Sequence, residues 1–318
     1  VTILRPPSGP PQVACLTSSG RDSMFLGVQR FAEWDGVWEY TNDGRVQRVA
    51  GTQGTSANAI LADSQGRLWV GTSEGVLVLD NDFVVTYNMS DGLPSDLVIS
   101  LYEDSRGVIW VGTEGGGAAC FDGQVFQVIR MVGDMPLNSV SAIAEAKGGV
   151  MWFATNGGLV RYQRKEVIPA AVLTLVSADR DYRPRDGLQV PDTAGRLSVS
   201  FQGRSSSVAS SELVYRYRLS GLAEAWHQTA ELEAEFTKLR PRSYTFELQV
   251  VDPDLNYSDV VAIDFEVTED PKIGALTAAL SDDRQGEFIG SSTSLEEVRR
   301  QVREVGWTDL TVLILGET

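Results

Sequence analysis

The chain has 318 residues, of which 42% are hydrophobic and 22% are charged, and it carries a net charge of −16. This composition is typical of a well-packed protein with about two domains. The acidic excess argues against contact with nucleic acid, because phosphate binding needs a basic surface. No stretch approaches about 18 consecutive apolar residues, so we expect no membrane-spanning helix.

The N-terminal residues VTILRPPSGPPQVAC lack the charged start and apolar core of a signal peptide. The chain begins with Val1 rather than methionine, so we expect a processed protein or a fragment. Its two cysteines, Cys15 and Cys120, match no metal-binding spacing. Two unpaired thiols in a reducing compartment are the favoured interpretation, and a disulfide stays open as the alternative.

A repeat of about 42 residues runs through the first half of the chain. Trp69, Trp110 and Trp152 lie 41 and 42 residues apart, and Phe25 takes the same place in a degenerate copy 44 residues before Trp69. Trp69 and Trp110 follow a turn of the type Asp-Ser-x-Gly, in which the aspartate caps the turn and the glycine takes a positive φ, and Trp152 follows Ala146-Lys-Gly-Gly in the same place.

The residues around each tryptophan predict four short strands per repeat. In the third copy the alternating run 98–103 is a strand with one buried face, the tryptophan lies in the next strand, and residues 124–128 fit a fourth. The run 83–87 fits the fourth strand of the second copy, and 158–162 fits the third strand of the last copy. Four strands per 42 residues are typical of a β-propeller blade.

Residues 20–167 resemble the two-component regulator propeller repeat. The resemblance is carried by Leu-Pro-x-Asp/Asn, then Asp-Ser-x-Gly-x-x-Trp-x-Gly-Thr, then Gly-Gly, and the last copy departs from it at Ala146 and Ala154. In that family such blades form sensor domains of bacterial signalling proteins. About four blades are present, and an open arc would leave exposed strand edges, so we expect earlier blades to have been removed.

Two other interpretations of the repeat concern ligands. Residues 114–117, Glu-Gly-Gly-Gly, could cradle phosphate, but the missing Gly-Lys-Ser/Thr and the missing helix pattern favour a hairpin turn. The repeated tryptophans could stack on a sugar ring. Their place between apolar neighbours in a strand favours a core between blades.

The repeat is absent from residues 168–268, and the pattern there predicts an antiparallel sandwich. The runs 196–201, 214–219, 244–251 and 260–267 all alternate between apolar and polar residues. This region contains the stretches YRYRLSG at 215–221, Trp226, and LRPRSYTF at 239–246. These stretches are similar to the Y-Y-Y module, an immunoglobulin-like domain that follows regulator propellers and is thought to relay their state. That module often precedes a membrane helix. None follows Val267 here, so we expect a cytoplasmic protein.

Catalytic candidates in these two regions are few. His227 is the only histidine, and beside Trp226 we expect it to be a surface or packing residue. A histidine-rich zinc site is therefore excluded, and a catalytic triad would have to be built around this one residue. The 43 acidic residues leave a glycosidase-like pair possible, although no pair stands out.

The pattern of the C-terminal residues predicts two helices followed by a buried strand. Residues 269–285 form an expected linker helix, Ser294 and Glu297 form a capping box before an amphipathic helix, and residues 310–315 form an apolar strand. This order, with the final TVLILGET, resembles the start of the AAA+ ATPase domain of sigma-54-dependent activators over residues 286–318.

That resemblance implies a partial nucleotide site. Gly316, Glu317 and Thr318 match the first positions of its phosphate loop, and Ile289 and Gly290 would lie near the nucleotide base. The loop needs a lysine to neutralise phosphate, and that lysine is absent because the chain ends first. We therefore expect no ATPase activity and no cofactor for this chain, with ATP and Mg bound only in an intact parent protein.

The combined prediction is a mainly β protein with four parts. They are a partial β-propeller of about four blades (1–167), a Y-Y-Y immunoglobulin-like sandwich (168–268), a linker helix (269–285) and the first part of a sigma-54 AAA+ domain (286–318). The expected function is the sensor and relay region of a sigma-54-dependent transcriptional regulator. Expected partners are an unknown small molecule or glycan on the propeller and, in the parent, further copies and sigma-54 RNA polymerase. A carbohydrate-binding or carbohydrate-active propeller is the alternative, and a scaffold that docks another protein is a third hypothesis.

Overall fold

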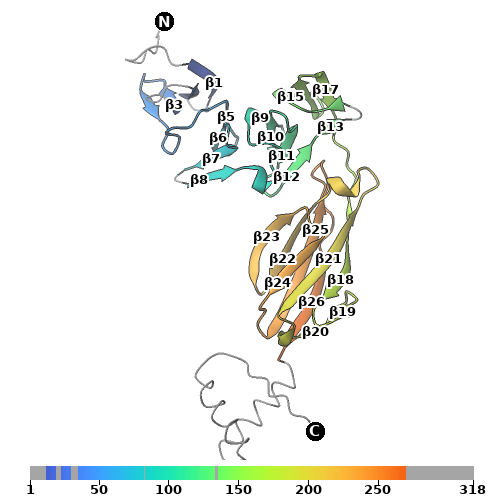
Figure 1. Cartoon of the computed structure of the whole chain (residues 1–318). Helices are drawn as coiled ribbons and strands as arrows, with labels where there is room; N and C mark the ends of the chain where they lie inside the picture. Colours follow the sequence, from blue (N-terminus) through green and yellow to red (C-terminus); the bar gives the residue numbers. More distant parts are fainter. Residues whose placement is uncertain (1–11, 19–22, 30–34, 82, 133–134, 270–318) are drawn as a thin grey trace, which may run out of the picture.

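The structure is a computed structural model that describes residues 12–18, 23–29, 35–81, 83–132 and 135–269 (Figure 1). These residues form a series of small antiparallel sheets followed by a sandwich of two larger sheets (Figure 1). The prediction of a mainly β chain with propeller-like and sandwich parts is confirmed. No helix in the described segments is both long enough and apolar enough to cross a membrane.

Four consecutive sheets, which we call blades 1 to 4, follow the repeat. Within each blade the strands pair in chain order, every strand antiparallel to the next. Blade 1 contains β1 (Gln12–Ser18), β2 (Ser23–Gln29), β3 (Gly36–Thr41) and β4 (Val46–Arg48), and blade 2 contains β5 (Ala59–Ala62), β6 (Leu68–Gly71), β7 (Val76–Asp80) and β8 (Phe83–Tyr87). Blade 3 contains β9 (Val98–Glu103), β10 (Ile109–Thr113), β11 (Ala118–Phe121) and β12 (Phe126–Ile129), and blade 4 contains β15 (Val140–Ala146), β16 (Val150–Thr155) and β17 (Gly158–Tyr162).

The expectation of four strands in every repeat is wrong for blade 4. Its sheet has three strands, because the chain runs from Tyr162 directly toward the first strand of the sandwich at Ala170. The short hairpin of β13 (Met131–Val132) and β14 (Met135–Pro136) precedes it. In blade 3 the fourth strand begins at Phe126 rather than at residue 124, because Asp122 caps the turn by accepting the backbone N–H groups of Gln124 and Val125.

Trp69 and Trp110 form the core between blades, as predicted. Trp69 of blade 2 packs among residues of blade 3, with its ring 5.8 Å from that of Phe121, and Trp110 of blade 3 lies 5.5 Å from Phe153 of blade 4. Both tryptophans are 0% exposed. A side chain without exposed surface cannot stack on a sugar, so these two residues form packing surfaces.

The aspartate of each turn also fixes the tryptophan. Asp63 Oδ1 accepts the backbone N–H groups of Gln65 and Arg67, at 3.0 and 2.8 Å, while Asp63 Oδ2 accepts the indole N–H of Trp69 at 2.8 Å. Asp104 repeats the arrangement and accepts the indole N–H of its own blade's tryptophan at 3.0 Å. The six-residue spacing between aspartate and tryptophan therefore couples the turn to the core between blades.

The serine of each turn ties one blade to the next. The backbone N–H and hydroxyl of Ser64 donate to the Glu103 carboxylate at 2.7 and 2.5 Å. Ser105 makes the same two bonds to Glu145, both at 2.7 Å. The two pairs link blade 2 to blade 3 and blade 3 to blade 4. They are exposed, so their contribution to stability is modest compared with that of the buried tryptophans.

A glycine two residues after Trp69 and after Trp110 allows the next blade to approach. A Cβ on Gly71 would lie 2.6 Å from Val98 Cγ1 of blade 3, and one on Gly112 would lie 2.5 Å from the Val140 carbonyl oxygen of blade 4. Both distances are shorter than any relaxed contact, so only glycine fits where a following blade is packed. Residues 115–117 form the turn between β10 and β11, which confirms the prediction of a hairpin rather than a phosphate loop.

The sandwich has a four-stranded sheet, ordered β19-β18-β21-β24, and a five-stranded sheet, ordered β20-β26-β25-β22-β23. Nearly all neighbours are antiparallel as predicted, and the exception is the parallel pair β20 and β26. Its core contains Phe201, Tyr215, Phe246 and Leu248, each at most 1% exposed. The strands are β18 (Ala170–Ser177), β19 (Asp181–Tyr182), β20 (Leu188–Pro191), β21 (Arg196–Arg204), β22 (Val214–Ser220), β23 (Ala223–Thr229), β24 (Glu233–Thr237), β25 (Arg242–Val251) and β26 (Val261–Thr268).

Candidate functional site

The sandwich is joined to blades 3 and 4 by a contact that we call the junction. On the blade side it comprises the β11–β12 turn, β12, β17 and the connecting residues 163–169. On the sandwich side it comprises β22, β23, the end of β25 and the loop 252–258 between β25 and β26. In Figure 1 the upper end of the sandwich lies beneath blades 3 and 4, as these contacts require. The junction is the place where the two parts of the chain can affect each other.

Strand β12 is held to the sandwich by two amide side chains. Gln127, which is 1% exposed, donates from Nε2 to the backbone carbonyl of Val251 at 2.7 Å. From the other side, Gln228 Nε2 donates to the carbonyl of Phe126 at 3.2 Å. A buried glutamine is stable only when its polar atoms are paired, so the Gln127 bond fixes how the sandwich sits on blade 3.

Arg216 on β22 is the charged centre of the junction. It is 7% exposed, and its Nη1 donates to Gln124 Oε1 at 2.6 Å. Its guanidinium lies over the ring of Trp226, 4.7 Å from the centroid, and 5.5 Å from that of Tyr257. The Tyr257 hydroxyl in turn donates to Asp122 Oδ2 at 2.5 Å. One cation, two aromatic rings and one carboxylate thus connect the sandwich to the β11–β12 turn.

The loop 252–258 is shaped by its first residue. The carboxylate of Asp252, which is 0% exposed, accepts the backbone N–H groups of Asp254 and Asn256 at 3.0 and 2.9 Å. Leu255 takes the left-handed conformation at φ 57°, which costs about 1 kcal/mol for a residue with a Cβ. Its side chain packs on the core between blades 3 and 4. The strained backbone therefore places an apolar side chain of the sandwich against the blades.

Blade 4 contributes a tyrosine to the same loop. The Tyr162 hydroxyl donates to Asp254 Oδ1, and Asn256 Nδ2 donates to the Lys165 carbonyl at 2.7 Å. Burial, reinforced by the hydrogen bond to Asp254, raises the pKa of Tyr162, and burial with the Asp122 bond raises that of Tyr257. Both phenols therefore remain protonated donors throughout the physiological pH range.

The partly buried Arg164 lies near Tyr162 and Cys120 at the junction. Arg164 Nε and Nη2 are buried and, among the residues that the structure describes, have no hydrogen-bond partner. The guanidinium is close enough to act on Cys120 and Tyr162, where its positive charge opposes the rise in their pKa values caused by burial. Two buried nitrogens without a hydrogen-bond partner cost free energy in the docked arrangement, so the junction is stabilised less strongly than a fully paired interface would be.

The two cysteines are free thiols in different blades, Cys15 in blade 1 and Cys120 in blade 3. Burial raises the pKa of Cys15 to about 11 and that of Cys120 to about 12. Because the thiolate is the reactive form, we expect neither to react readily with a disulfide reagent at about pH 8 while the protein is folded. Both should react on unfolding in denaturant. Rapid labelling of native Cys120 would contradict this packing.

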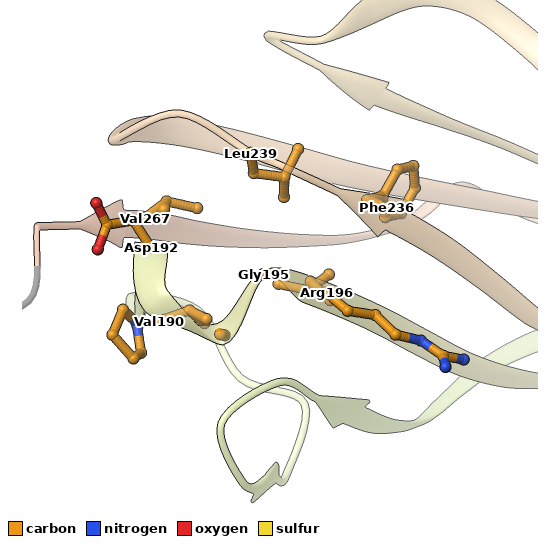
Figure 2. A pocket seen from close by; sticks show the side chains of 10 residues that line it. Val190, Asp192, Gly195, Arg196, Phe236, Leu239 and Val267 are labelled. Carbon is orange, nitrogen blue, oxygen red and sulfur yellow. The ribbon is translucent and has the colours of Figure 1, made fainter. Parts of the chain in front are cut away.

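A shallow pocket lies at the opposite end of the sandwich, near the end of β26 (Figure 2). Figure 2 shows apolar side chains of Val190, Phe236, Leu239 and Val267 around it, with Asp192 at the edge. Its cavity volume is about 20 Å³, which is room for one water molecule. A pocket of this size does not accommodate a signalling ligand.

The residues singled out from the sequence fall in several places. Gly316, Glu317, Thr318, Ile289 and Gly290 lie outside the described residues, as do the expected linker helix beyond residue 269 and the expected AAA+ part. His227 is exposed, with its ring 5.7 Å from that of Tyr217. Within the described segments, no cluster of three or more histidine, cysteine or acidic side chains could hold a metal ion.

Sequence reasoning missed the junction. Its polar groups come from residues 122–127, 162–165, 216–228 and 251–258, and no local motif connects these segments. Gln127 stands where alternation along the strand predicts a polar, solvent-facing residue, so nothing in the sequence signalled its burial.

Two family models match parts of the sequence. Residues 51–74 and 92–115 match the Two component regulator propeller, and residues 206–268 match the Y_Y_Y domain. Both resemblances are thereby confirmed over these residues. The first covers the tryptophan turns of blades 2 and 3, and the second covers β22 to β26 with the junction loop. The comparison with curated proteins found no match.

Several solved structures of low sequence identity match parts of this chain. The extracellular domain of BT3049 from B. thetaiotaomicron, described as a hybrid two component system, is 19% identical with a TM-score of 0.43, covering 80% of this chain and 38% of its own. The corresponding domain of BT4673 from the same organism is 15% identical, with a TM-score of 0.35 and coverages of 78% and 36%. PorZ of Porphyromonas gingivalis, a surface component of the type-IX secretion system, is 12% identical, with a TM-score of 0.36 and coverages of 76% and 37%. The chain thus spans less than two fifths of the length of these structures, and at these levels of similarity we draw no functional conclusion from them.

Proposed function

We propose that this chain is a sensor and relay region of a bacterial signalling protein. The regulator-propeller blades would receive the signal, and the Y_Y_Y sandwich would transmit it. The junction is the observation that carries the proposal. It makes the orientation of the sandwich depend on the positions of the β11–β12 turn and of β17, which belong to two different blades.

The relay requires two arrangements of the junction that a ligand distinguishes. A ligand changes an equilibrium only as far as it binds one arrangement better than the other. The two unpaired nitrogens of Arg164 and the strained backbone of Leu255 both lower the stability of the docked arrangement. A small relative movement of blades 3 and 4 would therefore be enough to favour separation of the sandwich from the blades. Gln127 and Tyr162, which donate hydrogen bonds to the sandwich, belong to different blades.

The test is hydrogen exchange on the full chain. A panel of sugars and small metabolites is first screened for binding by isothermal calorimetry. Each compound that binds is then tested for its effect on amide exchange in residues 252–258. We expect at least one binder to change exchange in this loop by several-fold. If every bound compound leaves the loop unchanged, the relay proposal is wrong.

The finer proposal is that the parent protein is a sigma-54-dependent regulator. It rests on the resemblance of residues 286–318 to the start of the AAA+ domain, and such a regulator would act in the cytoplasm, with ATP and Mg bound only in the parent. Further copies of the parent and sigma-54 RNA polymerase would be its partners. The test is the ATPase rate and ring assembly of the longer protein, which should depend on the compound that binds the blades.

The carbohydrate-active alternative is less well supported. Its proposed platform was the row of repeated tryptophans, and Trp69 and Trp110 have no exposed surface. A glycan remains a candidate signal for the blades in the proposal above. Glycan turnover by the purified chain would revive the alternative.

A further inference from the structure

The pocket in Figure 2 opens onto the end of the sandwich core that lies away from the blades. Its apolar walls come from both sheets. Val190 of β20 and Val267 of β26 belong to the five-stranded sheet, Phe236 of β24 belongs to the four-stranded sheet, and Leu239 lies in the loop after β24. The first three of these side chains are buried members of the core. The pocket is therefore a place where a further side chain can reach the core and contact both sheets.

One wall of the pocket is the short turn between β20 and β21, which contains Asp192, Ala194 and Gly195. Two backbone hydrogen bonds hold this turn. The Gly195 N–H donates to the Asp192 carbonyl at 3.3 Å, and the Lys238 N–H donates to the Gly195 carbonyl at 3.1 Å. The second bond joins the turn to the loop that carries Leu239. The two amides of Gly195 and Lys238 therefore report directly on the state of the pocket wall.

The walls of the pocket favour an apolar group over water. A water molecule inside a protein needs two to four polar partners, and the valine, phenylalanine and leucine side chains around the pocket offer none. The carboxylate of Asp192 lies at the outer edge (Figure 2). A cavity volume of about 20 Å³ fits the end of one aliphatic side chain and is too small for an aromatic ring.

The chain itself supplies such a side chain close by. Val267 lines the pocket, and only two residues separate it from Asp270-Pro271, a dipeptide that favours a turn. Ile273 follows this turn. The six residues from Val267 to Ile273 can span up to about 20 Å, so the isoleucine can reach back to the pocket. In the expected linker helix, Ile273 is the first member of an apolar stripe that continues with Leu276 and Leu280.

The charges beside the pocket also match this occupant. Lys272 directly precedes Ile273, so an isoleucine in the pocket would bring the lysine toward Asp192 at the edge. The nearby Arg196 is paired with Glu235 at 2.9 Å. An exposed pair of Lys272 with Asp192 would add little affinity, but it favours this arrangement over one in which like charges meet.

We propose that Ile273 fills this pocket and docks the start of the linker onto the end of the sandwich. The blades contact one end of the sandwich at the junction, and the linker would contact the other end. A shift of one sheet relative to the other would then change the pocket and release or hold the linker. The use of this contact in signalling rests on the proposed function, whereas the contact itself does not.

The test is a disulfide across the contact, formed in the full chain. Ala194→Cys in the pocket wall is combined with Ile273→Cys, which keeps a small apolar side chain in the linker. Because burial raises the pKa of Cys15 to about 11 and that of Cys120 to about 12, the native thiols do not compete at about pH 8. A disulfide requires Cα atoms within about 7 Å, so we expect mild oxidation to cross-link most of this variant. Mass spectrometry of tryptic peptides measures the cross-linked fraction.

Ala194→Cys with Ala275→Cys is the matched control. Ala275 is only two residues from Ile273, but in the expected helix it points about 200° away, so its cross-linking should be several-fold slower. Equal cross-linking of the two pairs, or none in either, would overturn the proposal.

A second measurement needs no added cysteine. Ile273→Asp should speed amide exchange at Gly195 and Lys238 several-fold, because the pocket wall loses its contact, whereas Ala275→Asp should leave both amides unchanged. Unchanged exchange in Ile273→Asp would also overturn the proposal. These readouts involve no ligand of the blades, and the relay is tested separately at residues 252–258, so either proposal can fail without the other.

Discussion

Replacing Trp110 with alanine is expected to lower the free energy of unfolding by about 3–5 kcal/mol, the usual cost of removing a large buried aromatic side chain. Trp110 has no exposed surface, packs on Phe153 and Tyr162, and donates its indole N–H to Asp104. The substitution therefore leaves a cavity between blades 3 and 4 and an unpaired carboxylate oxygen in the turn. Guanidinium denaturation followed by far-ultraviolet circular dichroism measures the change.

Trp152→Ala is the control for this experiment. It is the same substitution at the same place in the repeat, but Trp152 is half-buried and Ala146 offers it no carboxylate. For this variant we expect a loss of about 1 kcal/mol or less. Equal losses for the two variants would show that burial between blades does not determine the stability of this part of the chain.

The second large effect is expected for Arg216→Glu, which should separate the sandwich from the blades. Arg216 is almost fully buried between Gln124 and the rings of Trp226 and Tyr257. A glutamate there would lose the contacts with Gln124 and the two rings and would lie near Asp122, so we expect docking to weaken by about 3–5 kcal/mol, the usual cost of breaking a buried charge interaction. Thermal unfolding should split into two transitions, and proteases should cut within residues 163–169.

The sandwich itself should survive this substitution. Arg216 lies on the outer face of β22, whereas its neighbour Tyr215 is 1% exposed in the core. Arg196→Glu is the control, because the Arg196 side chain is 62% exposed and its ion pair with Glu235 is worth about 0–1 kcal/mol. A single transition at the wild-type temperature for Arg216→Glu would show that the junction does not hold the two parts together.

The blades were predictable because the residue patterns that determine them are local in the sequence. Alternating residues, a turn with Asp and Gly, and a tryptophan six residues after the aspartate all act within one repeat. Repetition then made the pattern recognisable against chance. The strands of the sandwich followed from alternation in the same way, although the parallel pairing of β20 with β26 did not.

The missing fourth strand of blade 4 shows the limit of this reasoning. The repeat predicted a strand from composition, yet after Tyr162 the chain passes to the sandwich. The half-buried state of Trp152 has the same origin, since its burial depends on a neighbouring blade rather than on its own strand. A residue can thus match a motif and still differ in environment from its counterparts.

The amino-acid order alone was enough to define the blades, the sandwich and the packing role of Trp69 and Trp110, because hydrophobic alternation and turn chemistry operate over a few residues. The junction came only from the folded chain. Gln127 and Val251 are 124 positions apart, and Tyr257 and Asp122 are 135 positions apart. Side chains that far apart meet only when several sheets have packed, so no local pattern in the sequence could have paired them.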